Sequence, residues 1–219
     1  MSKEKEHVAG PLDPVERAME ALFGLIMVLT FTGSLSVLNA GRQEVREMLI
    51  GALGCNLAWG IIDACFYLMG VLSERGRKIK RFERLRASSD AKVVEEVFYE
   101  ALPEGVVDVM TAEERASLRQ RLVNYPDPPR SAKLKWNDIK GAISVFFWVF
   151  LTTFPVALPF LFVQNSFIAL RISNGIAILL LFFIGRRLAR YAGFSVWGTS
   201  LFMVFFGLIM VAITIALGG

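Results

Sequence analysis

Long apolar stretches alternate with shorter polar segments along this chain of 219 residues. Five of these stretches approach or exceed the roughly 20 residues that an α-helix needs to cross a bilayer. Their approximate limits are 18–39, 48–72, 141–163, 167–185 and 196–217. The pattern therefore predicts an all-α, polytopic membrane protein with five transmembrane helices.

The longest polar segment, residues 74–139, separates the second apolar stretch from the third. Apolar residues recur at helical spacing within it, most clearly over 93–102. The run Thr111-Ala112-Glu113-Glu114 has the pattern of a capping box, which satisfies the first backbone N–H groups of a helix. We therefore expect a helical insert at 74–139 between two membrane segments, 1–73 and 140–219.

Basic residues are concentrated on one side of the predicted spans. Seven lie between positions 75 and 86, and Arg186, Arg187 and Arg190 follow the fourth stretch. By the positive-inside rule the N-terminus and the insert are cytoplasmic, and the C-terminus is outside. In a bacterium the host membrane would be the plasma membrane. The net charge of +4 then comes from clusters of basic residues that lie beside anionic lipid. Because lipid accounts for these clusters, we expect no nucleic-acid partner.

Asp63 is the only formally charged side chain between Leu49 and Leu72. A charged acid at the centre of a bilayer costs roughly 2.5–3.5 kcal/mol on insertion scales, so such residues are functional-site candidates. Asn56 and Tyr67 share its helix face, at spacings of seven and four residues. This row indicates a cation or proton pathway inside the membrane. The alternative is a protonated Asp63 that only hydrogen-bonds to a neighbouring helix.

Other acids are weaker candidates. Glu20 lies about one turn inside the first span, where a solvated interfacial role is equally open. Carboxylates of the insert offer the oxygen ligands that divalent cations accept. They could equally form a solvated face or, at Glu113 and Glu114, serve a helix N-terminus. The candidates in the insert are Glu96, Glu100, Glu113 and Glu114.

The chain contains no pattern typical of an enzyme. It has one histidine and two cysteines, and both cysteines lie in the second apolar stretch. There is no phosphate-binding loop, nucleophile elbow or HExxH motif. We therefore expect no catalytic activity and no tightly bound cofactor.

Three segments resemble the vacuolar iron transporter (VIT) family. Residues 61–70, IIDACFYLMG, are similar to the second helix of the family, which typically reads IADGISMGLG. Glu20 falls where the family has an acid in its first helix. Residues 154–160, FPVALPF, resemble the proline-rich part of the third helix, where two prolines predict a bend. The order of two spans, an acidic helical insert and three spans is also similar.

This resemblance implies a homodimer that exchanges Fe²⁺ or Mn²⁺ for protons across the membrane. Glu20 and Asp63 would hold the metal within the membrane, and the four carboxylates of the insert would collect it. The family's serine–methionine pair is Phe66-Tyr67 here, and its acid after the glycine is Val71. These differences leave open a different cation or a loss of transport.

Two functions follow from these observations. In the first, the protein is a transporter of divalent cations, in which Asp63 alternately holds a proton and a metal ion. In the second, it is a non-transporting membrane scaffold or regulatory protein whose insert binds a partner protein.

Overall fold

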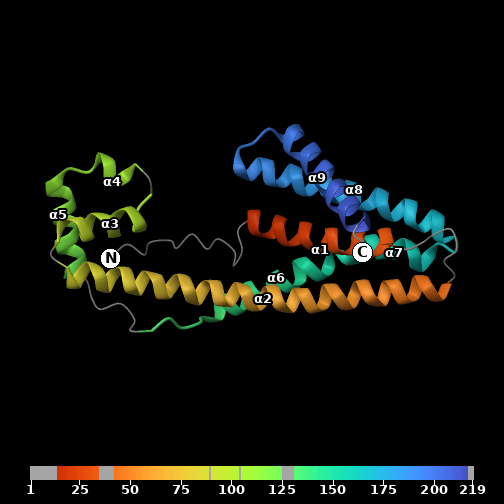
Figure 1. Ribbon diagram of the computed structural model, residues 1–219, viewed down its shortest axis with the longest axis horizontal. Coiled ribbons are helices and arrows are strands. Elements are labelled where there is room, and N and C mark those ends of the chain that lie inside the picture. The colour runs from red at the N-terminus through yellow and green to blue at the C-terminus, as the bar shows by residue number, and fades with distance from the viewer. Residues whose placement is uncertain (1–13, 35–41, 89, 104, 125–130, 217–219) are drawn as a thin grey trace, which may run out of the picture. The chain divides into compact units, whose positions relative to one another are not determined.

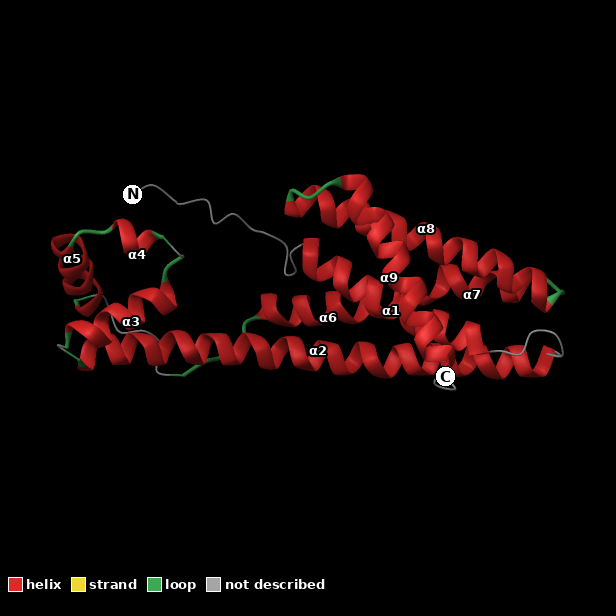
Figure 2. Ribbon diagram, turned by 45° about the horizontal axis from the view of Figure 1, so that its top comes forward, coloured by secondary structure: helices red, strands yellow, loops and turns green. Residues whose placement is uncertain are grey.

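A computed structural model describes residues 14–34, 42–88, 90–103, 105–124 and 131–216 (Figure 1). Every regular element in these ranges is a helix, so the prediction of an all-α fold is confirmed (Figure 2). The predicted ends of the first and fifth spans lie partly outside the described residues. The helices are α1 (Pro14–Ser34), α2 (Arg42–Ala87), α3 (Ala91–Ala101), α4 (Val106–Val109), α5 (Ala112–Val123), α6 (Trp136–Leu151), α7 (Thr153–Phe162), α8 (Ser166–Ala192) and α9 (Val196–Ala216).

The chain forms two compact units. Residues 1–67 and 136–219 make up the first, which we call the membrane unit, and residues 68–135 make up the second, the insert unit. Helix α2 contributes to both, because it continues without interruption from Arg42 to Ala87. The cytoplasmic location of the insert unit stays a prediction.

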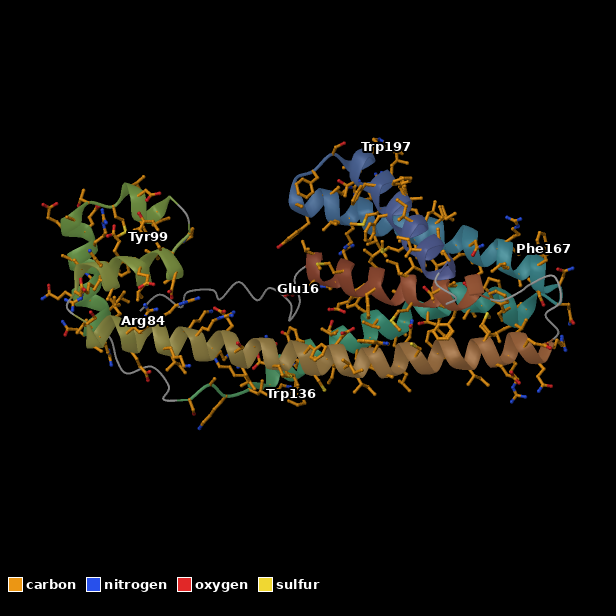
Figure 3. All side chains as sticks on the ribbon, viewed as in Figure 1. Glu16, Arg84, Tyr99, Trp136, Phe167 and Trp197 are labelled. Carbon is orange, nitrogen blue, oxygen red and sulfur yellow. The ribbon has the colours of Figure 1, made fainter. Side chains whose placement is uncertain are left out.

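Three helical segments among the described residues have the length and hydropathy of a membrane span. They are Arg42–Ala87, Trp136–Phe162 and Ser166–Ala192, and part of α9, Val196–Met210, is a shorter apolar helix. Trp136 and Trp197, at the starts of α6 and α9, are exposed (Figure 3). Tryptophans are enriched in this way at membrane–water interfaces. These features are those of an integral membrane protein, whereas the count of five spans stays a prediction.

Helix α1 packs against α6, α7, α8 and α9 and so lies at the centre of the membrane unit. Its Leu25 and Val28 have no exposed surface, and they meet Val156 of α7 and Leu181 of α8 in one apolar core. The large side chains that point away from this core are exposed, as expected for a surface that faces lipid.

The third apolar stretch is interrupted at a single residue, Thr152, whose backbone itself keeps a helical conformation (φ −66°, ψ −18°). Helix α6 ends at Leu151 and α7 begins at Thr153, with Pro155 and Pro159 inside the second piece. Proline has no backbone N–H, so it cannot donate the helical hydrogen bond to the carbonyl four residues earlier. The break is therefore a consequence of the sequence Thr152-Thr153-Phe154-Pro155.

Gly24 allows α1 to approach this break closely. A Cβ atom at Gly24 would overlap the Val149 carbonyl oxygen and the Thr152 hydroxyl. The Thr152 hydroxyl itself donates to the Val149 carbonyl at 2.8 Å. Only glycine therefore fits at this position of α1.

The insert unit is built on the last turns of α2. Leu85 of α2 packs with Val94, Val97 and Phe98 of α3 in a small buried core. The capping box expected at Thr111 is present: its hydroxyl accepts from Glu114 N at 3.2 Å, and the Glu114 carboxylate accepts from Thr111 N at 2.8 Å.

Replacing Gly24 with alanine tests the close approach of α1 to the helix break. We expect a loss of about 1–3 kcal/mol of stability, the usual range for overpacking. Gly175→Ala in α8 is the matched control, since no atom lies within 4 Å of its Cβ position and alanine favours a helix over glycine by ~1 kcal/mol. Thermal unfolding in detergent, followed by tryptophan fluorescence, should show a lower midpoint for Gly24→Ala alone. Equal midpoints for wild type and Gly24→Ala would contradict the contact.

Candidate functional site

Contacts between α1 and α2 fix the register of these two helices. The Asn56 side-chain amide donates to the Gly24 carbonyl at 3.0 Å. The rings of Phe23 and Trp59 meet edge to face, with their centroids 5.8 Å apart. From the first contact to the second, the residue number falls along α1 and rises along α2, so the two helices are antiparallel. One turn further on, Glu20 of α1 therefore lies level with Asp63 of α2.

Glu20 and Asp63 form an acidic pair, which we call the acid pair. Both side chains are half-buried, and the Asp63 carboxylate acts electrostatically on Glu20, as does Glu16 one turn before it. The Oδ2 atom of Asp63 is buried and has no hydrogen-bond partner among the described residues. Two carboxylates in such a setting repel each other unless a proton or a cation neutralises them. The pair can therefore bind either one.

Asn56 lies deeper in the membrane unit and has no exposed surface. Its Nδ2 atom donates to the Gly24 carbonyl and to the Thr153 hydroxyl, and so links α2 to α1 and α7. Its Oδ1 atom is buried and has no hydrogen-bond partner in the described part of the chain. Buried polar atoms of this kind are uncommon in folded proteins and call for a missing donor or cation.

Tyr67 completes the row of polar residues on α2. Its ring lies against Gly141 of α6, closely enough that a Cβ atom there would overlap it. The row of Asn56, Asp63 and Tyr67 is buried or half-buried, whereas neighbours such as Phe66 are exposed. The structure therefore places the whole row on the side of α2 that meets α1 and α6.

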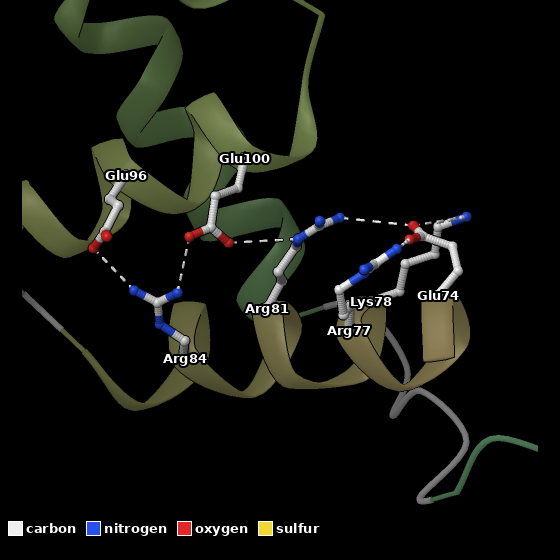
Figure 4. Close-up of polar contacts among 7 residues, drawn as sticks. All are labelled: Glu74, Arg77, Lys78, Arg81, Arg84, Glu96 and Glu100. Carbon is white, nitrogen blue, oxygen red and sulfur yellow. Dashed lines mark hydrogen bonds and ion pairs between the residues drawn. The ribbon is translucent and has the colours of Figure 1, made fainter. Parts of the chain in front are cut away.

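Two of the candidate acids of the insert are bound by arginines (Figure 4). Arg84 contacts Glu96 at 2.9 Å and Glu100 at 3.2 Å, and Arg81 contacts Glu100 at 3.5 Å. A metal ion at Glu96 and Glu100 would have to displace these guanidinium groups.

The arginine contacts continue along α2. Arg81 also reaches Glu74, at 3.9 Å. A hydrogen bond from Arg77 to Glu74 holds the pKa of the Glu74 carboxyl below its ordinary value. The carboxylates of Glu74, Glu96 and Glu100 are therefore already paired with guanidinium groups of the same unit.

Glu113 and Glu114 lie in the first turn of α5. Both are exposed, and the Glu114 carboxylate serves the capping box. Among the described residues, no group of three or more histidine, cysteine, aspartate or glutamate side chains is arranged to hold a metal ion. The structure therefore brings Glu20 and Asp63 together but does not gather the four acids of the insert into one site.

Sequence reasoning missed two buried polar residues, Thr153 and Asp138. Thr153 is wholly buried against Asn56, and Asp138, in the first turn of α6, is 6% exposed. The signal for Thr153 is its position two residues before Pro155, where a hydroxyl can satisfy backbone groups freed by the proline. Asp138 lies three residues before the third apolar stretch, a position typical of a solvated interfacial acid.

Removing the arginines tests whether Glu96 and Glu100 are masked. In the double variant Arg81→Gln/Arg84→Gln both carboxylates lose charge-assisted hydrogen bonds, and we expect Mn²⁺ to bind the insert roughly tenfold more tightly. Protection of the insert from limited proteolysis, titrated with Mn²⁺, measures this affinity. Arg121→Gln, on the exposed face of α5, is the control. Equal protection in wild type and the double variant would show that the arginines do not mask a site.

Comparison with known protein families gives one match. The sequence model of the VIT family matches residues 78–219, more than half of the chain. A comparison with curated proteins gives no match. The matched segment begins within α2 and runs to the end of the chain, so Glu20, Asn56, Asp63 and Tyr67 precede it. What these four residues do is therefore argued from their geometry.

Proposed function

The chain belongs to the VIT family, and on this premise we propose that it carries divalent metal ions, iron or manganese, across a membrane in exchange for protons. The observation that carries the proposal is the acid pair. Two half-buried carboxylates, Glu20 on α1 and Asp63 on α2, lie close enough to interact electrostatically inside an apolar helical unit.

The acid pair supports exchange because protons and metal ions compete for the same oxygen atoms. Carboxylate oxygens are suitable ligands for Mn²⁺ and also bind Fe²⁺. They bind a metal ion only when deprotonated, so metal binding releases protons. A divalent cation between Glu20 and Asp63 neutralises both charges, and protons do so once the metal leaves. Asn56 and Tyr67 extend the polar row on either side of Asp63 and would line the pathway.

The acids of the insert would act as collecting residues on the cytoplasmic side. Glu113 is exposed and the capping box is formed by Thr111 and Glu114, so the Glu113 carboxylate can meet a passing cation. The other three acids now accept hydrogen bonds, Glu96 and Glu100 from Arg84 and Glu114 from Thr111 N. They would bind a metal ion only after it displaces these donors.

We also propose that two copies of the chain associate in the membrane. Gly54 and Ala58 on α2 are both exposed, and no atom lies within 4 Å of the Cβ position of Gly54. Small residues four apart let two membrane helices approach closely. The second copy would pack there, and lipid would cover the remaining apolar surface.

One observation favours the alternative of a scaffold that binds a partner. A groove of about 310 Å³ opens between α3 and α5 of the insert unit, with Val94 and Phe98 in its floor and Arg115 at its edge. A partner peptide with apolar side chains would fit this groove, since Arg115 already pairs with Glu95 at 2.9 Å. A protein of this kind would move no divalent ion.

Metal flux separates the two functions and tests Asp63 directly. Purified protein in proteoliposomes should transport Mn²⁺ under an imposed pH gradient. We expect Asp63→Asn to lower the initial rate by at least an order of magnitude, since even outer-shell changes at metal sites cost 10–100-fold. Asp108→Asn, in the insert unit, is the matched control and should keep the wild-type rate. Equal rates for wild type and Asp63→Asn would remove Asp63 from the mechanism, and no flux of any divalent ion would favour the scaffold.

A further inference from the structure

The exposed side of α8 changes from apolar to basic towards the C-terminal end of the helix. The buried residues of α8 recur every four positions and pack inside the membrane unit. Leu179 and Phe183 lie on the opposite side and are exposed. Arg187 and Arg190 continue that side one and two turns after Phe183, and both are exposed as well. These four residues form one surface with an apolar half and a basic half, which we call the arginine face.

The positive charge at this end of α8 has no counter-charge among the described residues. No aspartate or glutamate follows Asp138 in the sequence, so α7, α8 and α9 contain no carboxylate side chain. Arg186 lies beside the arginine face and is half-buried. Neither it nor Arg187 or Arg190 forms a hydrogen bond or an ion pair with any residue that the structure describes. An anion from outside the chain would therefore meet three unpaired guanidinium groups here.

The spacing of the two exposed arginines fits a phosphate group. Arg187 and Arg190 are three residues apart on one helix, a spacing that places their Cβ atoms about 5–6 Å from each other. Both side chains can therefore reach one anion. Guanidinium groups bind phosphate oxygens through paired, charge-assisted hydrogen bonds. The basic half of the arginine face is thus suited to a phosphate.

Aromatic residues mark this end of α8 as the level of the membrane–water interface. Tyr191 and Trp197 are both exposed, and Trp197 lies beside the turn between α8 and α9 (Figure 3). Such residues are enriched at the headgroup level of a bilayer. Phe183 and Leu179 lie about 6 Å and 12 Å along the helix axis from Arg187, towards the apolar middle of α8. The basic half therefore lies at the headgroup level, and the apolar half lies at the level of the acyl chains.

We propose that the arginine face binds an anionic phospholipid, with its phosphate on Arg187 and Arg190 and an acyl chain along Phe183 and Leu179. A zwitterionic lipid fits less well, because its ammonium group would lie among three arginines with no carboxylate to meet it. Basic pockets on membrane helices bind anionic headgroups in this way. A general attraction of basic residues to a membrane surface would not depend on which arginines are present, whereas this site does. The inference does not rest on the proposed function, so the two can fail separately.

Selective retention of lipid tests the basic half. The full chain, purified in detergent, is incubated with equal amounts of phosphatidylglycerol and phosphatidylcholine, and bound lipid is counted by native mass spectrometry. Wild type should retain phosphatidylglycerol in preference to phosphatidylcholine. Arg187→Gln/Arg190→Gln should lower the retention of phosphatidylglycerol roughly tenfold, because two charge-assisted contacts to the phosphate are lost.

A second double variant controls for net charge. Lys92→Gln/Arg121→Gln removes the same two charges from exposed positions of the insert unit and should retain lipid as wild type does. The unfolding midpoint without added lipid should be the same for wild type and Arg187→Gln/Arg190→Gln, since the two arginines make no contact within the described chain that the substitution would break. Equal retention in wild type and Arg187→Gln/Arg190→Gln, or an equal loss in both double variants, would overturn the proposal.

The apolar half separates a lipid from a soluble phosphate compound. Phe183→Ala should lower phosphatidylglycerol retention roughly fourfold, the effect of one buried CH₂ group, and should keep the preference over phosphatidylcholine. Phe202→Ala on α9 is the matched control, because Phe183 and Phe202 are both 59% exposed. It should retain lipid as wild type does. Unchanged retention in Phe183→Ala, or displacement of phosphatidylglycerol by an equal concentration of glycerol 3-phosphate, would show that phosphate alone is recognised and would contradict a lipid site.

Discussion

Two half-buried carboxylates, Glu20 and Asp63, interact electrostatically inside an apolar helical unit, and the proposed function depends on their mutual repulsion. Asp63 and Glu20 repel each other, and Glu16 adds a further negative charge. Protons and a divalent cation are alternative ways to relieve this repulsion. A structural hydrogen bond alone would leave Oδ2 of Asp63 with a donor, and among the described residues it has none. This unpartnered oxygen supports the proposal that the acid pair is a binding site.

The position of the acid pair depends on close contacts between backbones. Gly24 lets α1 lie against the end of α6, and Gly60 lets α6 lie against α2. The Asn56 amide then joins α2 to α1 and to the start of α7. Because these contacts link four helices near one point, a shift in any of them would move Asn56 relative to Asp63. The helix break beside Thr153 is the part of the unit best suited to absorb such a shift.

Hydropathy and periodicity predicted much of the fold but less of the site. The long apolar runs, the capping box at Thr111 and the shared face of Asn56, Asp63 and Tyr67 all follow from local spacing along a helix. That Glu20 lies level with Asp63 depends on the register between two helices, which spacing within one helix does not determine. The pairing of Glu96 and Glu100 with Arg84 is likewise a contact between separate helices. Sequence reasoning offered these acids either as metal ligands or as a solvated face, because nothing local shows the arginines opposite them.

Proton release on metal binding tests the central claim most directly. Mn²⁺ is titrated into the purified protein in detergent and weak buffer near neutral pH, and the protons released per bound ion are counted. If protons and metal compete for Glu20 and Asp63, about one to two protons should leave per Mn²⁺ bound at this pair, and Glu20→Gln together with Asp63→Asn should abolish the proton release and the binding coupled to it. Mn²⁺ binding without proton release, or release that survives in the double variant, would contradict the account.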